Sequence, residues 1–267
     1  MKIFSNYLNK LDTKQETPVR YALLDDKSKL VLNDLIGEQL KFTFTGEIRC
    51  IHCKRDIDKT YGQGFCYACY NTLPQAAPSI MRPELDLSHK GISRNMEWAK
   101  ENALIDHFVY LAISSSLKVG ITRHNQIPTR WIDQGAVKAI KIAKVPYRQL
   151  SGLIEVELKN YFADKTNWRQ MLTGKIDEST DLLKERDKAH KILKEKFGEY
   201  LIDDNITEIT YPISQYPEKV NSINFDKTPE FQSKLIGIKG QYLIFDSNQV
   251  LNIRKHNGYF VAIDLIK

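Results

Sequence analysis

The chain has 267 residues, 42% hydrophobic and 27% charged, so it can form one large globular domain or two to three modest ones. Its 39 Lys or Arg against 33 Asp or Glu give a net charge of +6, which only mildly favours polyanionic partners. The sequence lacks the apolar stretch of a signal peptide, and no run approaches the roughly 18 apolar residues of a membrane helix. We therefore expect a cytoplasmic protein with no membrane partner.

Residues 1–49 have the pattern of β-strands. Residues 30–36 are mostly apolar, and residues 40–45 (Leu-Lys-Phe-Thr-Phe-Thr) alternate with a period of two. Residues 73–95 hold three prolines and Gly91, which predict irregular structure.

All four cysteines lie between these segments, in the spacing Cys-x2-Cys-x12-Cys-x2-Cys. In a reducing compartment such clustering indicates metal rather than disulfides, and twelve residues between the pairs suit a β-turn-β ribbon. Four thiolates close a tetrahedral shell, which predicts a structural zinc site at Cys50, Cys53, Cys66 and Cys69. His52 is an alternative ligand, and the other reading is four free cysteines that only pack.

The middle of the chain combines strand and helix patterns. Apolar runs predict strands, and apolar residues at helical spacing predict helices, the last of which ends at Gly198. The expected strands are 108–113, 117–121 and 137–145, and the expected helices are 127–135, 150–162 and 181–197.

The tail, from about residue 205, again has the pattern of short strands separated by Lys-Gly, Ser-Asn and Asn-Gly turns. The expected class is therefore α+β. The expected layout is a β-rich region with a zinc ribbon (1–104), an α/β domain (105–200) and a small β domain (201–267). The two β portions either form separate domains or pack together as one sheet system.

Residues 108–131 contain a recognisable order of motifs. Phe108-Val-Tyr-Leu-Ala is followed by Lys118-Val-Gly-Ile-Thr and then by Arg130-Trp131. This order resembles the GIY-YIG nuclease superfamily, in which two strands carry a tyrosine and a glycine and a following helix carries an arginine. Glu155, with Leu158 and Phe162 after it, is similar to that family's metal-binding glutamate on a later helix. The resemblance covers roughly residues 105–170.

The resemblance implies a catalytic set of Tyr110, Lys118, Arg130 and Glu155, with Gly120 as the motif glycine and Glu155 as the ligand of a catalytic Mg or Mn ion. Phosphodiester hydrolysis needs a group that activates water, a divalent ion and a cation near the phosphate, and this set could supply them. Lys118 stands where the family usually has an aromatic residue, but some members carry lysine there, and a lysine whose pKa is lowered can act as a base.

A second resemblance spans most of the chain. Residues 62–69 (Gly-Gln-Gly-Phe-Cys-Tyr-Ala-Cys), 81–84 (Met-Arg-Pro-Glu), 118–124 and 129–136 are similar to a bacterial group filed as domain of unknown function 2797. Members carry further cysteines between the ribbon and the middle domain, where this chain has none. The group implies no function.

Four residues near the expected catalytic set are candidates for nucleic-acid binding. Arg123 and His124 follow the glycine-bearing strand and suit either phosphate contact or simple exposure. Trp131 and Gln134 either line a groove, with the tryptophan stacked on a base, or serve as a core anchor and a helix stop.

Three functional hypotheses result. The first is a zinc-ribbon protein with a GIY-YIG-like core that binds DNA or RNA, with metal-dependent endonuclease activity left open. The second is a non-catalytic module that binds nucleic acid or a ribonucleoprotein, and the third is a structural or protein-interaction role. Convergence of the four catalytic candidates at one site favours the first.

Overall fold

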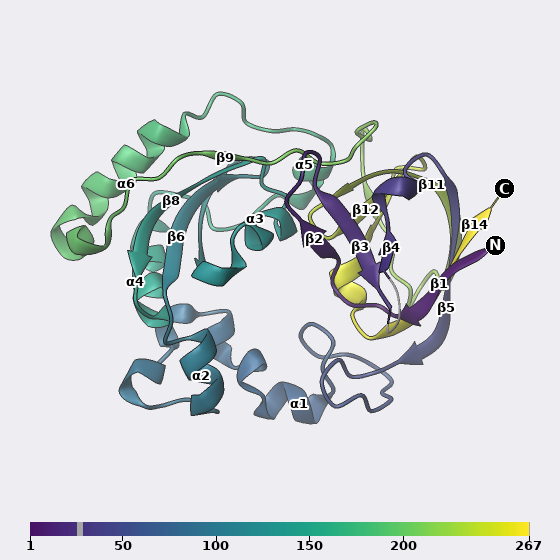
Figure 1. Cartoon of the computed structure of the whole chain (residues 1–267), viewed down its shortest axis with the longest axis horizontal. Helices are drawn as coiled ribbons and strands as arrows, with labels where there is room; N and C mark the ends of the chain where they lie inside the picture. Colours follow the sequence, from purple (N-terminus) through teal and green to yellow (C-terminus); the bar gives the residue numbers. More distant parts are fainter. Residues whose placement is uncertain (26–28, 267) are drawn as a thin grey trace. The chain divides into compact units, whose positions relative to one another are not determined.

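The structure is a computed structural model that describes residues 1–25 and 29–266. The chain forms two compact units (Figure 1). Unit 1 contains residues 1–70, 172–174 and 209–267, and unit 2 contains residues 71–171 and 175–208. Residues 71–104, grouped above with the amino-terminal β region, therefore lie in unit 2, and the boundary falls just after the last cysteine.

Both ends of the chain contribute strands to the larger sheet of unit 1. Its strand order is β1-β14-β5-β11-β12-β13-β10. Strand β5 pairs antiparallel with both β14 and β11, so the amino-terminal (purple) and carboxy-terminal (yellow) strands form one sheet (Figure 1). The seven strands are β1 (Lys2–Tyr7), β5 (Gln39–Ile48), β10 (Asn221–Ser222), β11 (Glu230–Lys239), β12 (Tyr242–Phe245), β13 (Gln249–Asn252) and β14 (Tyr259–Ile266).

The predicted alternation at residues 40–45 is found in β5, where Leu40 and Phe42 are buried. The Phe42 ring stacks on Phe231 at 4.9 Å between centroids, and Phe245 meets both rings edge-on. Such pairs add to the stability that apolar burial supplies. A smaller sheet has the order β2-β3-β4, with β2 (Asp12–Lys14), β3 (Arg20–Leu24) and β4 (Lys29–Val31).

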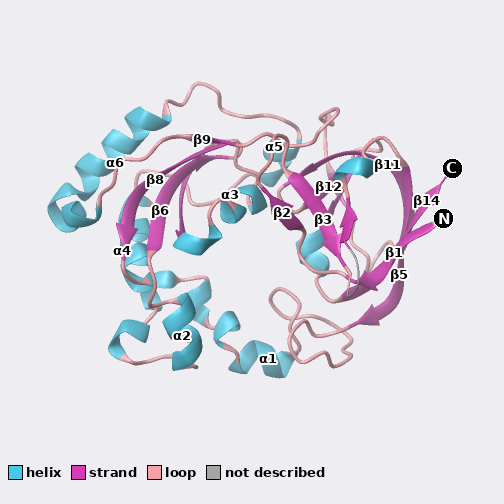
Figure 2. Ribbon diagram, in the orientation of Figure 1, coloured by secondary structure: helices cyan, strands magenta, loops and turns pink. Residues whose placement is uncertain are grey.

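Unit 2 mixes helices with a four-stranded antiparallel sheet of order β7-β6-β8-β9 (Figure 2). The strands are β6 (His107–Ile113), β7 (Leu117–Arg123), β8 (Lys138–Val145) and β9 (Thr207–Glu208). The helices are α2 (Met96–Asn102), α3 (Thr129–Asp133), α4 (Arg148–Leu158) and α6 (Leu182–Phe197), while the residues of α1 (Tyr67–Thr72) and α5 (Trp168–Leu172) are divided between the units. The structure is thus α+β, as predicted.

The side-chain alternation of β6 separates the two faces of the sheet in unit 2. Val109, Leu111 and Ile113 point into the hydrophobic core, where apolar residues of α4 and α6 cover them. Tyr110 and Ala112 point to the opposite face. Residues 73–95, predicted to be irregular, form a series of short 3-10 turns. Within the described residues, no helix is both long and apolar enough to cross a membrane.

Candidate functional site

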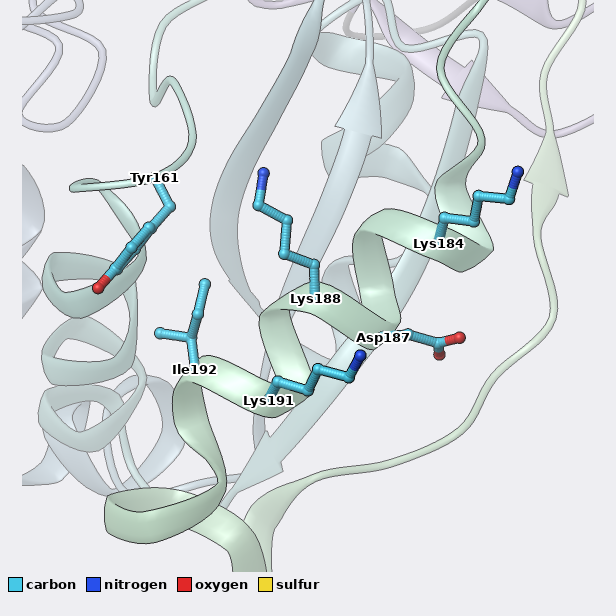
Figure 3. Close-up of a pocket in the computed structure, with 6 residues that line it drawn as sticks. All are labelled: Tyr161, Lys184, Asp187, Lys188, Lys191 and Ile192. Carbon is cyan, nitrogen blue, oxygen red and sulfur yellow. The ribbon is translucent and has the colours of Figure 1, made fainter.

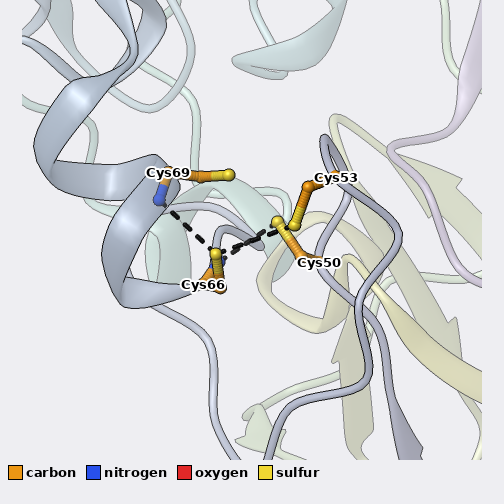
Figure 4. A group of neighbouring side chains, drawn as sticks. All are labelled: Cys50, Cys53, Cys66 and Cys69. Atoms are coloured by element: carbon orange, nitrogen blue, oxygen red, sulfur yellow. Dashed lines mark hydrogen bonds between the residues drawn. The ribbon is translucent and has the colours of Figure 1, made fainter.

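The four cysteines meet at one place in unit 1 (Figure 4). Cys50 and Cys53 lie in the turn after β5, while Cys66 immediately precedes α1 and Cys69 lies within it. The four Sγ atoms are within 4.8 Å of one another, and those of Cys53 and Cys66 are 3.8 Å apart. His52 is exposed and does not belong to this group.

The sulfur geometry fits a tetrahedral metal. Zinc–sulfur distances of about 2.3 Å place the sulfur atoms of a four-cysteine site roughly 3.8 Å apart. The backbone N–H of Cys66 donates to Cys50 Sγ at 3.2 Å and that of Cys69 donates to Cys66 Sγ at 3.4 Å, which stabilises thiolate charge. The four cysteines can therefore hold a structural metal such as zinc, with all four ligand positions supplied by protein.

The close approach of the four cysteines changes the acidities of their thiols. Burial raises the pKa of the Cys50 thiol, but backbone N–H groups of Cys66, Cys53 and His52 outweigh it and bring the pKa to about 6. Burial and the neighbouring thiols raise the pKa of Cys69 to about 12. Four thiolates cannot sit this close without a positive charge among them, and a coordinated zinc ion would supply that charge.

A second cluster of polar side chains lies in unit 2. Tyr110 and Lys118 stand on the sheet face opposite to the hydrophobic core, while α4 contributes Glu155. Tyr110 of β6 pairs in register with Gly120 of β7, and a Cβ atom at Gly120 would stand 2.7 Å from the Tyr110 hydroxyl. The phenol therefore lies across the glycine. It is completely buried and donates a 2.9 Å hydrogen bond to Oε1 of Gln134.

Electrostatic interactions join the four predicted catalytic residues. Burial raises the pKa of Tyr110, the Arg130 guanidinium lowers it, and the Glu155 carboxylate raises it. Burial lowers the pKa of Lys118 to about 8, assisted by Arg130 and opposed by Glu155. The structure thus brings together Tyr110, Lys118, Arg130 and Glu155, from β6, β7, α3 and α4.

The Glu155 carboxylate belongs to a small ionic network. Burial raises its pKa, while Lys159, one helical turn further along the chain, lowers it. The Lys159 ammonium lies 3.4 Å from Glu155 and 3.5 Å from Asp164, and so bridges two carboxylates. Asp164 follows Ala163, which pairs with Lys118 of β7. The two carboxylates and Lys118 therefore border the same place.

The candidates for nucleic-acid binding have different environments. Arg123 ends β7, is half-buried and hydrogen-bonds to the side-chain oxygen of Asn102. His124 is exposed and begins a short 3-10 turn. Gln134 Oε1 accepts a hydrogen bond from the Tyr110 hydroxyl, so it orients a member of the cluster.

The proposed stacking of Trp131 on a base needs correction. Its side chain is only 1% exposed and meets the Tyr110 ring edge-on at 5.9 Å between centroids. Trp131 is therefore a core residue, as in the alternative interpretation. The helix-stop interpretation of residues 134–135 also agrees with the structure. Gly135 follows α3 at φ +68°, and a Cβ there would stand 2.2 Å from Met171 Sδ.

Arg148 joins the same cluster but was not among the sequence candidates. It opens α4, donates to the carbonyl oxygens of Ser79 and Ile80, and lies 4.0 Å from Asp86. Burial lowers its pKa, Asp86 raises it, and the positive charges of Arg123 and Arg130 lower it further. Because Ser79, Ile80 and Asp86 lie about 65 residues away in sequence, no local pattern marks Arg148.

The family described as "Protein of unknown function (DUF2797)" matches residues 37–261. The chain belongs to this DUF2797 family. No curated protein and no solved structure matches the chain.

The DUF2797 match includes both clusters described above. The cysteines at positions 50–69 and the charged cluster from Tyr110 to Asp164 lie inside it, whereas β1 to β4 precede it. The family therefore extends across both compact units. It supplies no activity, so any function depends on the chemistry of the side chains themselves.

Proposed function

We propose that unit 2 carries a phosphodiester-hydrolysing site and that the protein is a divalent-metal-dependent nuclease acting on DNA or RNA. The observation that carries the proposal is the convergence of Tyr110, Lys118, Arg130 and Glu155 from four separate elements. The similarity of residues 105–170 to GIY-YIG nucleases supports it. The zinc cluster would then stabilise unit 1, and its thiolates suit the reducing cytoplasm.

The properties of these side chains suit the reaction. With a pKa of about 8, Lys118 is neutral in about a tenth of molecules at pH 7 and can accept a proton from the attacking water. Arg130 supplies a fixed positive charge for the phosphate oxygens. The hydrogen bond to Gln134 fixes the Tyr110 hydroxyl within the cluster.

The carboxylates also suit a hard divalent cation. Magnesium is usually held by one or two protein carboxylates together with water and substrate phosphate, and Glu155 with Asp164 supplies that number. Lys159 lies between them, and its ammonium would have to move away from both. When bound, the ion would neutralise charge that develops on the phosphate.

One observation favours the second candidate, a module that binds nucleic acid without cleaving it. Tyr110 has no exposed surface, and Lys118 is only 4% exposed. A substrate phosphate would therefore need local rearrangement to reach both groups. The cations Lys118, Arg123, Arg130 and Arg148 would contribute to polyanion binding in either case.

Cleavage of labelled single-stranded, branched and duplex DNA and RNA, in magnesium or manganese, tests the proposal. We expect Glu155→Ala and Tyr110→Phe each to lower the rate at least about a hundredfold. Glu157→Ala is the matched control, because Glu157 lies on the same helix and pairs instead with Lys196. Each variant is checked for zinc content and folding.

The outcomes separate the candidates. Cleavage that both variants lose and the control keeps supports the nuclease. Absence of cleavage by the wild type, with salt-sensitive binding intact, favours the binding module. If the wild type neither cleaves nor binds nucleic acid, both candidates are wrong and the structural role remains.

A further inference from the structure

A basic hollow lies beside α6, away from the residues already assigned a role (Figure 3). It measures about 460 Å³. Figure 3 shows Tyr161 on one side and the residues of α6 on the other. We call this site the α6 hollow, and its lining residues are Tyr161, Lys184, Asp187, Lys188, Lys191 and Ile192.

The charge of the α6 hollow is suited to a polyanion. Three lysines against one aspartate line it. Lys184 pairs with Asp181, the residue that caps α6, at 3.8 Å, and Lys188 pairs with the partly exposed Glu185 of its own helix at 3.4 Å. Such surface pairs contribute little, so both ammonium groups can turn to a ligand at small cost. In the described part of the chain, Lys191 has no ion pair.

An exposed aromatic ring lies among these charges. Tyr161 is 53% exposed, so its ring is accessible to a ligand. It lies next to Phe162, which is buried and receives the Lys188 ammonium over its face at 5.2 Å. A flat ring beside lysines is the combination with which proteins hold single strands, because bases stack on the ring while lysines contact phosphates.

The segment that carries Tyr161 also borders the proposed catalytic cluster. Residues 159–164 connect α4 to the bridge between Ala163 and Lys118. From this segment, Lys159 pairs with Glu155, and the Asp164 carboxylate raises the pKa of Lys118. Tyr161 and Phe162 instead face α6. One short loop therefore separates the catalytic cluster from the α6 hollow.

We propose that the α6 hollow binds a single-stranded stretch of nucleic acid, with one base stacked on Tyr161 and phosphates at Lys184, Lys188 and Lys191. The inference rests on the proposed function, because it takes the strand to be the one that the neighbouring cluster acts on. The α6 hollow would make the protein select substrates that have an unpaired segment beside the reacting phosphate.

The test measures binding of labelled single-stranded and duplex 20-mers of DNA and RNA to the full-length protein over a range of salt concentrations. Replacing Lys184, Lys188 and Lys191 together by Gln should weaken single-strand binding at least tenfold and lower the salt slope by about 2. Gln at the exposed Lys90, Lys100 and Lys175 removes the same charge elsewhere in unit 2 and should have little effect. Tyr161→Ala should weaken single-strand binding about tenfold, whereas Tyr161→Phe keeps the stacking surface and the affinity.

Hydrolysis of a small chromogenic phosphodiester, too short to reach the hollow, separates this inference from the proposed function. Loss of oligonucleotide binding in the hollow variants, with small-diester hydrolysis retained, supports both. If the hollow variants keep their affinity for oligonucleotides and Arg130→Gln loses it, the binding role of the α6 hollow is wrong and the proposed nuclease activity is unaffected. Equal losses in the hollow and control triples also overturn it. If oligonucleotide binding depends on the α6 hollow but the protein hydrolyses no diester, the binding role of the hollow is supported and the nuclease proposal is rejected.

Discussion

Gly120 has no room for a side chain, because the Tyr110 phenol occupies the space that a Cβ atom would need. An added Cβ would stand 2.7 Å from the hydroxyl oxygen and 2.8 Å from Cζ. We expect Gly120→Ala to destabilise the protein by about 1–3 kcal/mol and to displace the hydroxyl from Gln134. Thermal unfolding measures the first effect and nucleic-acid cleavage the second.

Gly198→Ala is the control for that substitution. Gly198 follows α6 at φ −55°, with nothing within 4 Å of the position that a Cβ atom would take. Alanine there should be neutral or stabilise by up to about 1 kcal/mol, because it restricts the unfolded chain. Equal stability of the two alanine variants would show that Tyr110 does not lie across Gly120 as described.

The burial of Lys118 predicts how the stability of the protein depends on pH. Burial lowers its pKa in the folded protein to about 8 from 10.5, so between these values the unfolded chain binds a proton that the folded chain lacks. Stability therefore gains a contribution of up to about 3 kcal/mol as pH rises through this window, and the gain is complete above 10.5. Lys118→Met should remove this contribution, as measured by denaturant unfolding at several pH values.

Lys239→Met separates that stability effect from catalysis. Lys239 of β11 is also fully buried, with a pKa lowered by burial to about 8, but it lies in unit 1. Both methionine variants should flatten the pH dependence of stability. If Lys118 is the base, only Lys118→Met should also abolish the rise in cleavage rate toward pH 8. An unchanged rate profile in Lys118→Met would rule out this base.

The site residues found from sequence are those carried by short motifs. Tyr110, Lys118 and Gly120 lie on two strands joined by a short turn, so their register follows from local pairing. Arg148 and Asp164 act through distant chain segments, which a single sequence does not place. Trp131 shows a different limit. An aromatic residue suits both a core and a stacking surface, and only its burial in the structure identifies it as a core residue.

At the scale of elements, the well-predicted segments are those whose apolar pattern is continuous or clearly periodic. Strands β6, β7 and β8 lie close to their predicted positions, and α6 ends at Phe197 as expected. Helix α4 was predicted to reach Phe162 but ends at Leu158. Because the Phe162 N–H still bonds to the Leu158 carbonyl, the helical spacing of apolar residues continues past the helix end.

Other elements leave a weak signal. Residues 30–36 read as one apolar run, but β4 stops at Val31 and a 3-10 turn follows. The Asn33 side chain accepts from the Tyr21 N–H and donates to the Val19 carbonyl, so it holds the turn through contacts that hydropathy does not reveal. Helix α2 has seven residues with only Ala99 buried, too few for a period to emerge.

The amino-terminal cap of α6 gives a prediction for that helix. The Asp181 carboxylate accepts hydrogen bonds from the N–H groups of Leu183 and Lys184 at 3.0 and 3.3 Å. Asp181→Ala should therefore cost about 1 kcal/mol in chemical denaturation. Asp203→Ala, which removes only an exposed partner of Arg186, should cost less than about 0.5 kcal/mol. A cap variant as stable as this control would contradict the capping role.

At the scale of the whole molecule, the two clusters occupy different compact units. The cysteines lie entirely in unit 1, and the charged cluster lies entirely in unit 2. Sequence order does not predict this division, because β5 pairs with β11 and β14, which lie about 190 and about 220 residues further along the chain. The pairing of distant segments in one sheet depends on tertiary contacts that local patterns do not encode.

Metal removal should therefore act on one unit more than on the other. Structural zinc contributes on the order of 10 kcal/mol to small zinc-binding folds, so chelation or Cys66→Ser should lower the melting temperature of unit 1 by at least about 10 °C. Hydrogen exchange should rise in residues 49–70 while β6 to β8 keep their protection.

His52→Ala is the control, because His52 lies between two ligands but outside the sulfur group, and it should retain one equivalent of zinc. Faster exchange throughout β6 to β8 on chelation, or zinc lost from His52→Ala, would show that the metal supports the protein in a different way.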